Sequence, residues 1–386
     1  MHKVKCPLSS VVEHSLYMRV VGGSSPSAGT MTDYLSKKIR NISFLGILFV
    51  FLQHSINFTG YIDPATTFIG QGNINAIIQY IIGYGVARPA VALFFLLSGY
   101  LFFRNFNITK TFEKYRSRMK TLFVPYILWN LLAILSIIVF QLVFSDYFPT
   151  FYTGYLPGKS LLTYLQMIYN HGVAFQLWFL RDLMLYTLFA PIIYIAVRYI
   201  GIVLLIPLCL FWLIRIPLPS FFSFLDRGGL FYLVGVYLAM HPISISQPIS
   251  KKLFTFTGIL WFIILIVKTY IAFFSSGLTS YLSILDNIAI VLGLFTIWFG
   301  YDTIAQSKIV AWFGNQALFT FFIYAAHEPL LEILKYIGIT IIGRNNTTLL
   351  VCYFLVPIVT YTFCISIAKY LQRYTASIYK ILTGGR

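Results

Sequence analysis

Charged residues are scarce in this chain of 386 residues: they make up 10% of it, and only 11 of them are acidic. A soluble domain carries about a quarter charged residues, so hydropathy overrides the two or three soluble domains that length alone would suggest. In their place, 59% of the residues are hydrophobic, and apolar runs long enough to cross a ~30 Å hydrocarbon core recur along the sequence. The composition therefore predicts a polytopic membrane protein embedded in a lipid bilayer.

Cysteine is also sparse, and no two cysteines form a CxxC pair. A zinc site or a disulfide framework is therefore not expected, and we expect no bound metal. Three of the four cysteines lie in apolar runs, where free thiols are usually core residues; the four are Cys6, Cys209, Cys352 and Cys364. The net charge is +17, but no dense block of basic residues indicates a nucleic-acid partner.

Apolar windows predict an all-α bundle of about ten transmembrane helices. These windows cover about residues 42–60, 86–103, 122–144, 175–197, 199–216, 229–242, 254–275, 282–300, 317–338 and 347–368. If the N-terminus is cytoplasmic, the inner segments carry roughly three times as many Lys and Arg residues as the outer ones, as the positive-inside rule requires. The sequence thus predicts cytoplasmic termini and one transmembrane domain over residues 31–386.

Residues 1–30 differ from the rest of the chain. They have neither helical periodicity nor an apolar core of signal-peptide length. The string SSVVEHSLYMRVVGGSSPSAG resembles the peptide obtained when a tRNA gene is translated, which indicates a misassigned start with the working protein beginning at Met31. The alternative is a disordered cytoplasmic tail.

Several ionisable residues lie inside the apolar runs. His54 interrupts GILFVFLQHSINF, and three basic residues fall in or at the edges of predicted spans: Arg88, Arg181 and Lys268. An ionisable group in a membrane is costly unless it meets a partner or a wet cavity, so each is a candidate functional residue. The structural alternative for His54 is a hydrogen bond between helices.

Three further stretches carry polar residues. Ser98 and Gly99 form a small-residue notch that admits a close backbone or a ligand. Arg181 and Asp182 are adjacent and point about 100° apart on a helix, so each is expected to find its partner on another span. In the late stretch ALFTFFIYAAHEPLLEIL, proline weakens the helix directly after two ionisable residues, His327 and Glu328. The two histidines lie at similar depth in different predicted spans, and Arg88, Arg181, Asp182 and Glu328 also lie near the outer side, so we expect one convergent site.

These stretches resemble the acyltransferase-3 family of bacterial multi-pass membrane enzymes. The matching pieces are RNISFLGILFVFLQHS, RPAVALFFLLSGYLFF, KYRSRMKTLFVPYILWN, LWFLRDLMLY and FFIYAAHEPLL, of which FFLLSGYLFF and LWFLRDL are the most specific. The resemblance implies transfer of an acyl group, often acetyl, from cytoplasmic acyl-CoA to a sugar hydroxyl of an envelope or exported glycan. It also implies a place in the bacterial inner membrane, with acyl-CoA as a substrate and no permanently bound cofactor.

The resemblance also implies roles for individual residues. His54 matches the essential first-span histidine, and His327 matches the histidine of the late motif. Arg88 matches the basic residue ahead of the family's FF-x-x-SG motif, and Arg181 matches the one in its WFLR motif. The family commonly has a basic residue where this chain has Ser43, and Arg40, one turn earlier on the same helix face, can reach the same volume.

The chemistry suits these residues, because a histidine can take the proton of a poorly nucleophilic alcohol and return it to the leaving thiolate. A fixed cation can stabilise the oxyanion or bind a donor phosphate, and we expect substrate or donor contacts from Arg40, Arg88, Ser98, Arg181, Asp182 and Glu328. The basic residues of the inner loop have two explanations: they bind the polyanionic CoA, or they only keep this loop on the cytoplasmic side by the positive-inside rule. These residues are Lys114, Arg116, Arg118 and Lys120.

Two alternatives to this enzyme remain open at the level of sequence. Intramembrane charges serve a polysaccharide exporter without its own chemistry equally well; a structural scaffold would leave the intramembrane cations and histidines without a use. The sequence also leaves open whether the acyl group passes through an acyl-histidine at His54 or moves directly from an inward-threaded pantetheine arm. It does not reveal the acceptor, the acyl chain or the oligomeric state.

Overall fold

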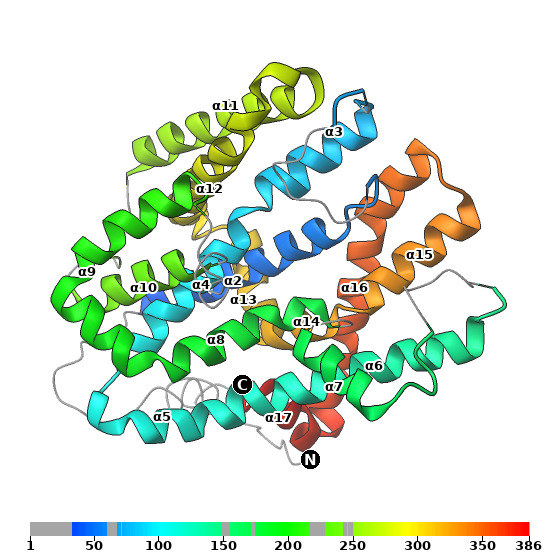
Figure 1. Cartoon of the computed structure of the whole chain (residues 1–386), viewed down its shortest axis with the longest axis horizontal. Coiled ribbons are helices and arrows are strands. Elements are labelled where there is room, and N and C mark those ends of the chain that lie inside the picture. The colour runs from blue at the N-terminus through cyan, green and yellow to red at the C-terminus, as the bar shows by residue number, and fades with distance from the viewer. Residues whose placement is uncertain are drawn as a thin grey trace, which may run out of the picture.

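The computed structural model describes residues 33–59, 68–70, 72–147, 155–170, 174–216, 228–241, 245 and 250–385, and every regular element within these ranges is helical. Figure 1 shows the arrangement of the helices. In chain order they are α2 (Asp33–His54), α3 (Ile74–Ile81), α4 (Pro89–Phe103), α5 (Thr111–Arg118), α6 (Val124–Phe144), α7 (Leu161–Asn170), α8 (Trp178–Leu188), α9 (Ala190–Leu213), α10 (Leu230–Met240), α11 (Lys251–Phe274), α12 (Leu282–Ile304), α13 (Lys308–Gln316), α14 (Thr320–Ala326), α15 (Leu330–Ile342), α16 (Asn346–Tyr374) and α17 (Ala376–Thr383).

Among the described residues, seven helical stretches are long and apolar enough to cross a membrane. They are Ile74–Phe103, Ile108–Phe144, Ala190–Leu213, Lys251–Phe274, Ser276–Ile304, Lys308–Ala326 and Asn346–Tyr374. The all-helical class and the multi-pass membrane character are therefore confirmed. The number of about ten spans and the cytoplasmic termini stay predictions, and residues 1–30 lie outside the described residues.

Helix α2 lies within the bundle, where it contacts α4, α12, α13, α14 and α16 (Figure 1). Its first half carries basic residues, and one of them, Lys38, is fully buried and donates to Asp302 of α12 at 2.6 Å. A buried ammonium is tolerated only with such a partner. The helix thus reaches the interior with His54 as its last residue.

Two of the predicted spans are wrong in their boundaries. The span predicted over 175–197 is two helices, because α8 ends at Leu188 and α9 starts at Ala190 with a proline in its first turn. Proline favours a helix start, because the N–H that it lacks would have no intrahelical partner there. The boundary predicted near residue 198 is instead a kink inside α9, at Ile200.

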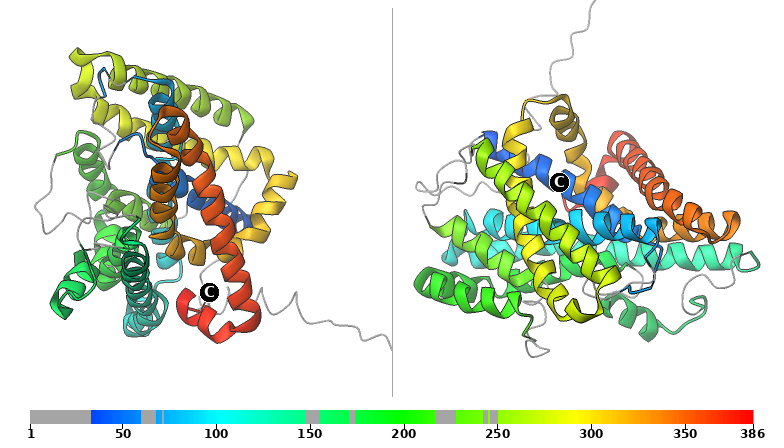
Figure 2. Two further views of the ribbon diagram at one scale, coloured as in Figure 1. Left: turned by 90° about the vertical axis from the view of Figure 1, so that its right-hand side faces the viewer. Right: turned by 90° about the horizontal axis from the view of Figure 1, so that it is seen from above.

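The span predicted over 317–338 is also interrupted. Helix α14 ends at Ala326 and α15 begins at Leu330, and the peptide bond between Glu328 and Pro329 is cis. The sequence predicted a weakened helix at this proline, and the structure makes it a complete break. After the break, α15 and α16 form one helical hairpin and α11 and α12 lie side by side as another pair (Figure 2).

Close backbone packing joins α4 to α10. A Cβ atom on Gly99 of α4 would collide with the carbonyl of Tyr232 on α10, and one on Gly235 of α10 would collide with the carbonyl of Leu96. Glycine is needed at both positions because no side chain fits between the two backbones. The predicted notch is therefore a helix–helix contact at Gly99. It fixes α4, and with it the position of Arg88 at the helix start.

Candidate active site

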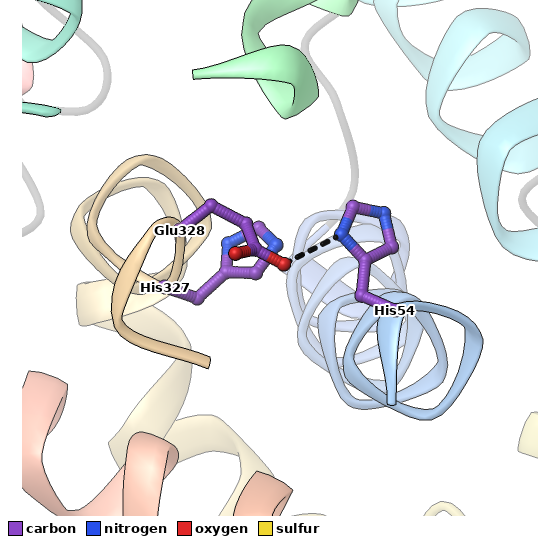
Figure 3. Close-up of side chains that lie close together, drawn as sticks. All are labelled: His54, His327 and Glu328. Atoms are coloured by element: carbon purple, nitrogen blue, oxygen red, sulfur yellow. Dashed lines mark hydrogen bonds and ion pairs between the residues drawn. The ribbon is translucent and has the colours of Figure 1, made fainter. Parts of the chain in front are cut away.

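His54, His327 and Glu328 lie together where the end of α2 faces the break between α14 and α15 (Figure 3). Nδ1 of His54 is 3.2 Å from Oε1 of Glu328, and the two imidazole centroids are 5.1 Å apart. His327 and Glu328 are buried, whereas 17% of the His54 side chain is exposed. The convergence of the two predicted histidines is confirmed in geometry, and Glu328 contacts the first of them.

The imidazole of His54 is held on two sides. With Glu328 as a carboxylate, which only accepts hydrogen bonds, Nδ1 of His54 donates and Nε2 carries the lone pair. The ring of Phe175 stacks on the imidazole with centroids 4.8 Å apart and planes at 21°. Phe175 precedes α8, so the stacking brings a third element to the site. These contacts fix the ring and leave Nε2 as its available base.

His327 has a fixed tautomer of its own. Its Nδ1 lies 2.7 Å from the carbonyl oxygen of Tyr324, and a carbonyl cannot donate, so Nδ1 carries the hydrogen. Nε2 of His327 is buried without a hydrogen-bond partner among the described residues, and so is Oε2 of Glu328. A buried polar atom without a partner is costly. Each of these two atoms therefore has hydrogen-bonding capacity that the described residues do not use.

Gln176 holds the helix break in place, and the sequence reasoning missed it. Its side-chain Nε2 donates to the carbonyls of Ala325 at 3.1 Å and Glu328 at 3.4 Å, and its backbone carbonyl accepts from the Tyr324 hydroxyl at 2.7 Å. The amide thus satisfies backbone groups that the broken helix leaves free. A glutamine at the start of the QLWFLRDL stretch is the signal that could have identified it.

Two neighbours of His54 were also missed. Lys335 of α15 donates to the carbonyls of His54 at 3.3 Å and Ile56 at 3.4 Å, so a cation lies at the C-terminal end of α2. Gln53 donates to the carbonyl of Ala87 at 2.5 Å, which joins the end of α2 to the segment just before Arg88. Gln53 precedes His54, and Ala87 precedes Arg88. This hydrogen bond therefore links the chain next to His54 with the chain next to Arg88.

Arg88 belongs to a buried charge cluster. Asp286 of α12 is fully buried and contacts three cations: Lys268 at 2.5 Å, Arg215 at 3.2 Å and Arg88 at 3.4 Å. Arg88 and Lys268 therefore each meet a partner, and they share one carboxylate. Local sequence does not indicate which carboxylate this is, because Asp286 is distant in the chain from both Arg88 and Arg215.

Arg181 and Asp182 correct a prediction. We expected each to pair across the bundle, but Nη2 and Nε of Arg181 contact Oδ1 of Asp182 at 3.2 and 3.3 Å. The arginine stem is long and flexible enough to bend back to a neighbouring residue, so the 100° between adjacent positions does not prevent the contact. Asp182 is buried and has a further interaction of its own.

Other predicted residues lie away from the histidines. Arg40 is 14 residues before His54 on the same helix, about 21 Å along the axis; its Nη2 lies near Gly314 of α13, and its Nε is buried without a partner among the described residues. Ser43 bonds its hydroxyl to the carbonyl of Ile39 at 2.8 Å. Ser98 is about 15 Å further along its helix than Arg88.

The predicted basic loop is helical. Lys114, Arg116 and Arg118 lie on α5 and Lys120 on the following π-helical turn, which continues into α6. The Tyr115 hydroxyl donates to the carbonyl of Leu188 at 2.7 Å, so α5 lies against the end of α8. The guanidinium of Arg118 lies over the ring of Phe102 at 5.0 Å. A contact of these cations with CoA stays a prediction.

All three site residues are also potential metal ligands. His54, His327 and Glu328 each offer one ligand atom, and these atoms lie within 4.8 Å of one another. Zinc bonds of about 2.0–2.2 Å bring tetrahedral ligand atoms to about 3.5 Å from one another, so a metal would require the groups to close in. The prediction of no metal stays a prediction, and the hydrogen-bonded pair describes the site as it stands.

A family model described as an acyltransferase domain, the acyltransferase-3 model, matches residues 39–369. The succinoglycan biosynthesis protein ExoH of Rhizobium meliloti (strain 1021) is 24% identical over 362 residues, which cover 90% of this chain and 91% of that protein. No solved structure matches this chain. The family match spans α2 to most of α16 and so contains every residue of the candidate site. The chain therefore belongs to the acyltransferase-3 family and is an acyltransferase for groups other than aminoacyl groups.

Proposed function

We propose that this protein transfers an acyl group, which we take to be acetyl, from cytoplasmic acyl-CoA to a hydroxyl of a cell-envelope or exported glycan. The observation that carries the proposal is the contact of His54 with Glu328, with part of the His54 side chain left exposed. A glycan acceptor is supported by the relative named for succinoglycan biosynthesis. The proposed location is the bacterial inner membrane, where a multi-pass protein can meet both substrates.

In the proposed reaction, Nε2 of His54 accepts the proton of the acceptor hydroxyl while its oxygen attacks the thioester carbonyl carbon. The carbon–sulfur bond of the tetrahedral intermediate then breaks, and the CoA thiolate takes the proton from the imidazolium. The products are an O-acyl glycan and CoA with a free thiol, and His54 returns to its neutral form. General base catalysis of this kind contributes about 10²–10⁴-fold to a rate.

Glu328 has a positioning role in this scheme. Its carboxylate keeps the hydrogen of His54 on Nδ1, which leaves Nε2 able to accept a proton, and it stabilises the imidazolium that forms. His327 presents a buried Nε2 without a protein partner. We propose that this nitrogen accepts a hydrogen bond from a substrate hydroxyl, which would orient the acceptor beside His54.

The donor is proposed to enter from the end of the bundle that holds the start of α2. Arg40 lies on that half of α2, with a buried Nε that lacks a protein partner. A guanidinium is well suited to a phosphate of CoA. Arg40 thus takes the place of the basic residue that the family commonly has at the position of Ser43, whose own hydroxyl is bonded within the helix.

Replacement of His54 by alanine tests the proposal. We expect His54→Ala to abolish acylation of the native glycan without lowering the amount of protein in the membrane. Acylation is measured as labelled acetyl transferred from acetyl-CoA to glycan. His241→Ala is the matched control, because this histidine lies at the end of α10 and bonds only locally, to the carbonyl of Tyr237.

Two results would decide against the proposal. Unchanged acyl content in the His54→Ala strain would remove His54 from catalysis. Glycan retained inside the cell, with its acylation unaltered, would instead support the exporter without acyl-transfer chemistry.

A further inference from the structure

The cluster around Asp286 contains more positive charge than its carboxylate can neutralise. Lys268 contacts Oδ1 of Asp286 at 2.5 Å and also donates to the carbonyl of Tyr84 at 2.6 Å, and its ammonium is fully buried. This short contact alone balances the carboxylate. The guanidinium of Arg88 is then an additional cation on the other oxygen, Oδ2, which Arg215 also contacts.

Within the part of the chain that the structure describes, Arg88 is a cation with unused hydrogen-bonding capacity. It contacts Asp286 only through Nε, at 3.4 Å, which is at the long end of the range for a hydrogen bond. A guanidinium has five N–H donors arranged in a planar fork, and 29% of the Arg88 side chain is exposed. Arg215 has further interactions of its own, so the inference rests on Arg88.

The position of Arg88 connects this charge to the histidine site. Its guanidinium projects from the start of α4, directly after Ala87, whose carbonyl accepts from Gln53 at 2.5 Å. Gln53 is adjacent to His54 in α2. Packing of α4 against α10 at Gly99 holds this helix in place, so Arg88 is a fixed cation at the same end of α2 as the proposed catalytic base.

We propose that Arg88, with Arg215 beside it, binds an anionic group of the substrate, either a carboxylate or a phosphate ester. Such groups accept two parallel hydrogen bonds from one guanidinium fork. The inference rests on the proposed function, because it takes the molecule bound at Arg88 to be one that reacts at His54. Asp286 and Lys268 position the two arginines and do not themselves contact the anion.

Binding of pyrophosphate and glucuronate to the purified full-length protein in detergent tests this proposal. We expect calorimetry to detect both anions with wild-type protein. Arg88→Gln should weaken each by at least about tenfold, as expected when a hydrogen bond to a charged group is lost, and Arg88→Lys should weaken them less. Arg198→Gln is the control and should bind as wild type, since Arg198 is exposed on α9 and bonds to Tyr194.

A second measurement needs no variant and so does not depend on folding of Arg88→Gln. Saturating pyrophosphate should protect Arg88 of the wild-type protein from phenylglyoxal, as read by peptide mass spectrometry, while Arg198 stays reactive. CoA is also proposed to bind at Arg40, about 21 Å from His54 along α2, so its effect is read as the phenylglyoxal reactivity of Arg88 in the Arg40→Gln protein. If CoA protects Arg88 there, the donor supplies the anion; if glucuronate protects it and CoA does not, the acceptor supplies it. Either result agrees with the proposal.

The proposal is overturned if wild-type protein binds neither anion, if Arg88→Gln binds both as wild type, or if pyrophosphate leaves Arg88 reactive. The His54→Ala protein separates this proposal from the acylation reaction. It should bind pyrophosphate as tightly as wild type even though it transfers no acyl group. Anion binding in a protein whose His54→Ala variant still acylates glycan would support the anion site and contradict the catalytic role of His54.

Discussion

Replacement of Glu328 by glutamine isolates the contribution of its carboxylate, because the amide has nearly the same shape. The amide either accepts more weakly from Nδ1 of His54 or donates to it, and donation would place the ring hydrogen on Nε2 and remove the base. A hydrogen bond to a charged group contributes about 1.5–3 kcal/mol. Since 1.36 kcal/mol is a factor of ten in rate, the loss lies between about 10-fold and 150-fold.

The observed geometry selects the lower part of this range. The distance of 3.2 Å between Nδ1 and Oε1 is longer than the 2.7–2.9 Å of a strong charge-assisted bond. We therefore expect Glu328→Gln to lower kcat/KM by about 10–50-fold. The assay measures initial rates of labelled acetyl transfer to the native glycan in membranes with equal amounts of each variant.

A double-mutant cycle distinguishes positioning of His54 from a general structural role. Loss of a general base leaves a residual rate about 10²–10⁴-fold below wild type, which labelled acetyl can follow in concentrated enzyme even where cellular acylation is absent. If Glu328 acts through His54, then Glu328→Gln should cause no further loss in this residual rate of a protein that already carries His54→Ala. Glu113→Gln, an exposed change on α5, serves as the control for removal of a carboxylate and should leave the rate unchanged. A full additional loss in the His54→Ala background, or no loss in the single variant, would refute the dyad.

Three further predictions follow from the packing and the charges. Arg40→Gln should raise KM for acetyl-CoA by about tenfold with little change in kcat, because the guanidinium is proposed to bind the donor. Gly99→Val should destabilise the protein by about 3 kcal/mol, because its side chain would meet a backbone carbonyl of α10 that cannot turn aside. Asp286→Asn should destabilise it by about 3–5 kcal/mol, because the buried ammonium of Lys268 loses its counter-charge.

Each of these predictions has a matched control. Gly277→Val adds a side chain where no atom lies within 4 Å, and Asp33→Asn removes an exposed carboxylate on α2; both should unfold at the wild-type temperature in detergent. In the Arg40→Gln protein, a second change of Ser43→Arg should restore donor affinity if a cation on this helix face is what binds CoA. An Arg40→Gln enzyme with wild-type KM would contradict the donor site.

The sequence identified the two histidines because an ionisable group inside an apolar run is conspicuous. It also identified the weakness of the helix at Pro329, since proline removes a hydrogen bond and clashes with the preceding turn. It did not reveal the break at Phe189. An apolar run continues across that position, and hydropathy does not record where a helix changes direction.

The hydrogen-bond and ion-pair partners of the charged side chains were the feature that sequence predicted least well. His54 and Glu328 are separated by 274 positions, and Lys38 and Asp302 by 264. The sequence indicated that buried cations need partners, but local rules cannot say which helices will be neighbours. Arg181 shows the opposite error, because its partner is the adjacent residue and we expected a distant one.

Hydropathy alone predicted that this protein is helical and embedded in a membrane. Apolar runs of this length can satisfy their backbone hydrogen bonds only within helices, whatever the neighbours are. It also determined which polar residues need an explanation. The three-dimensional structure was needed to show that Glu328 contacts His54, that Gln176 holds the helix break, and that one carboxylate, Asp286, contacts three cations. These contacts depend on which helices pack together, and packing is set by the shape of the whole bundle.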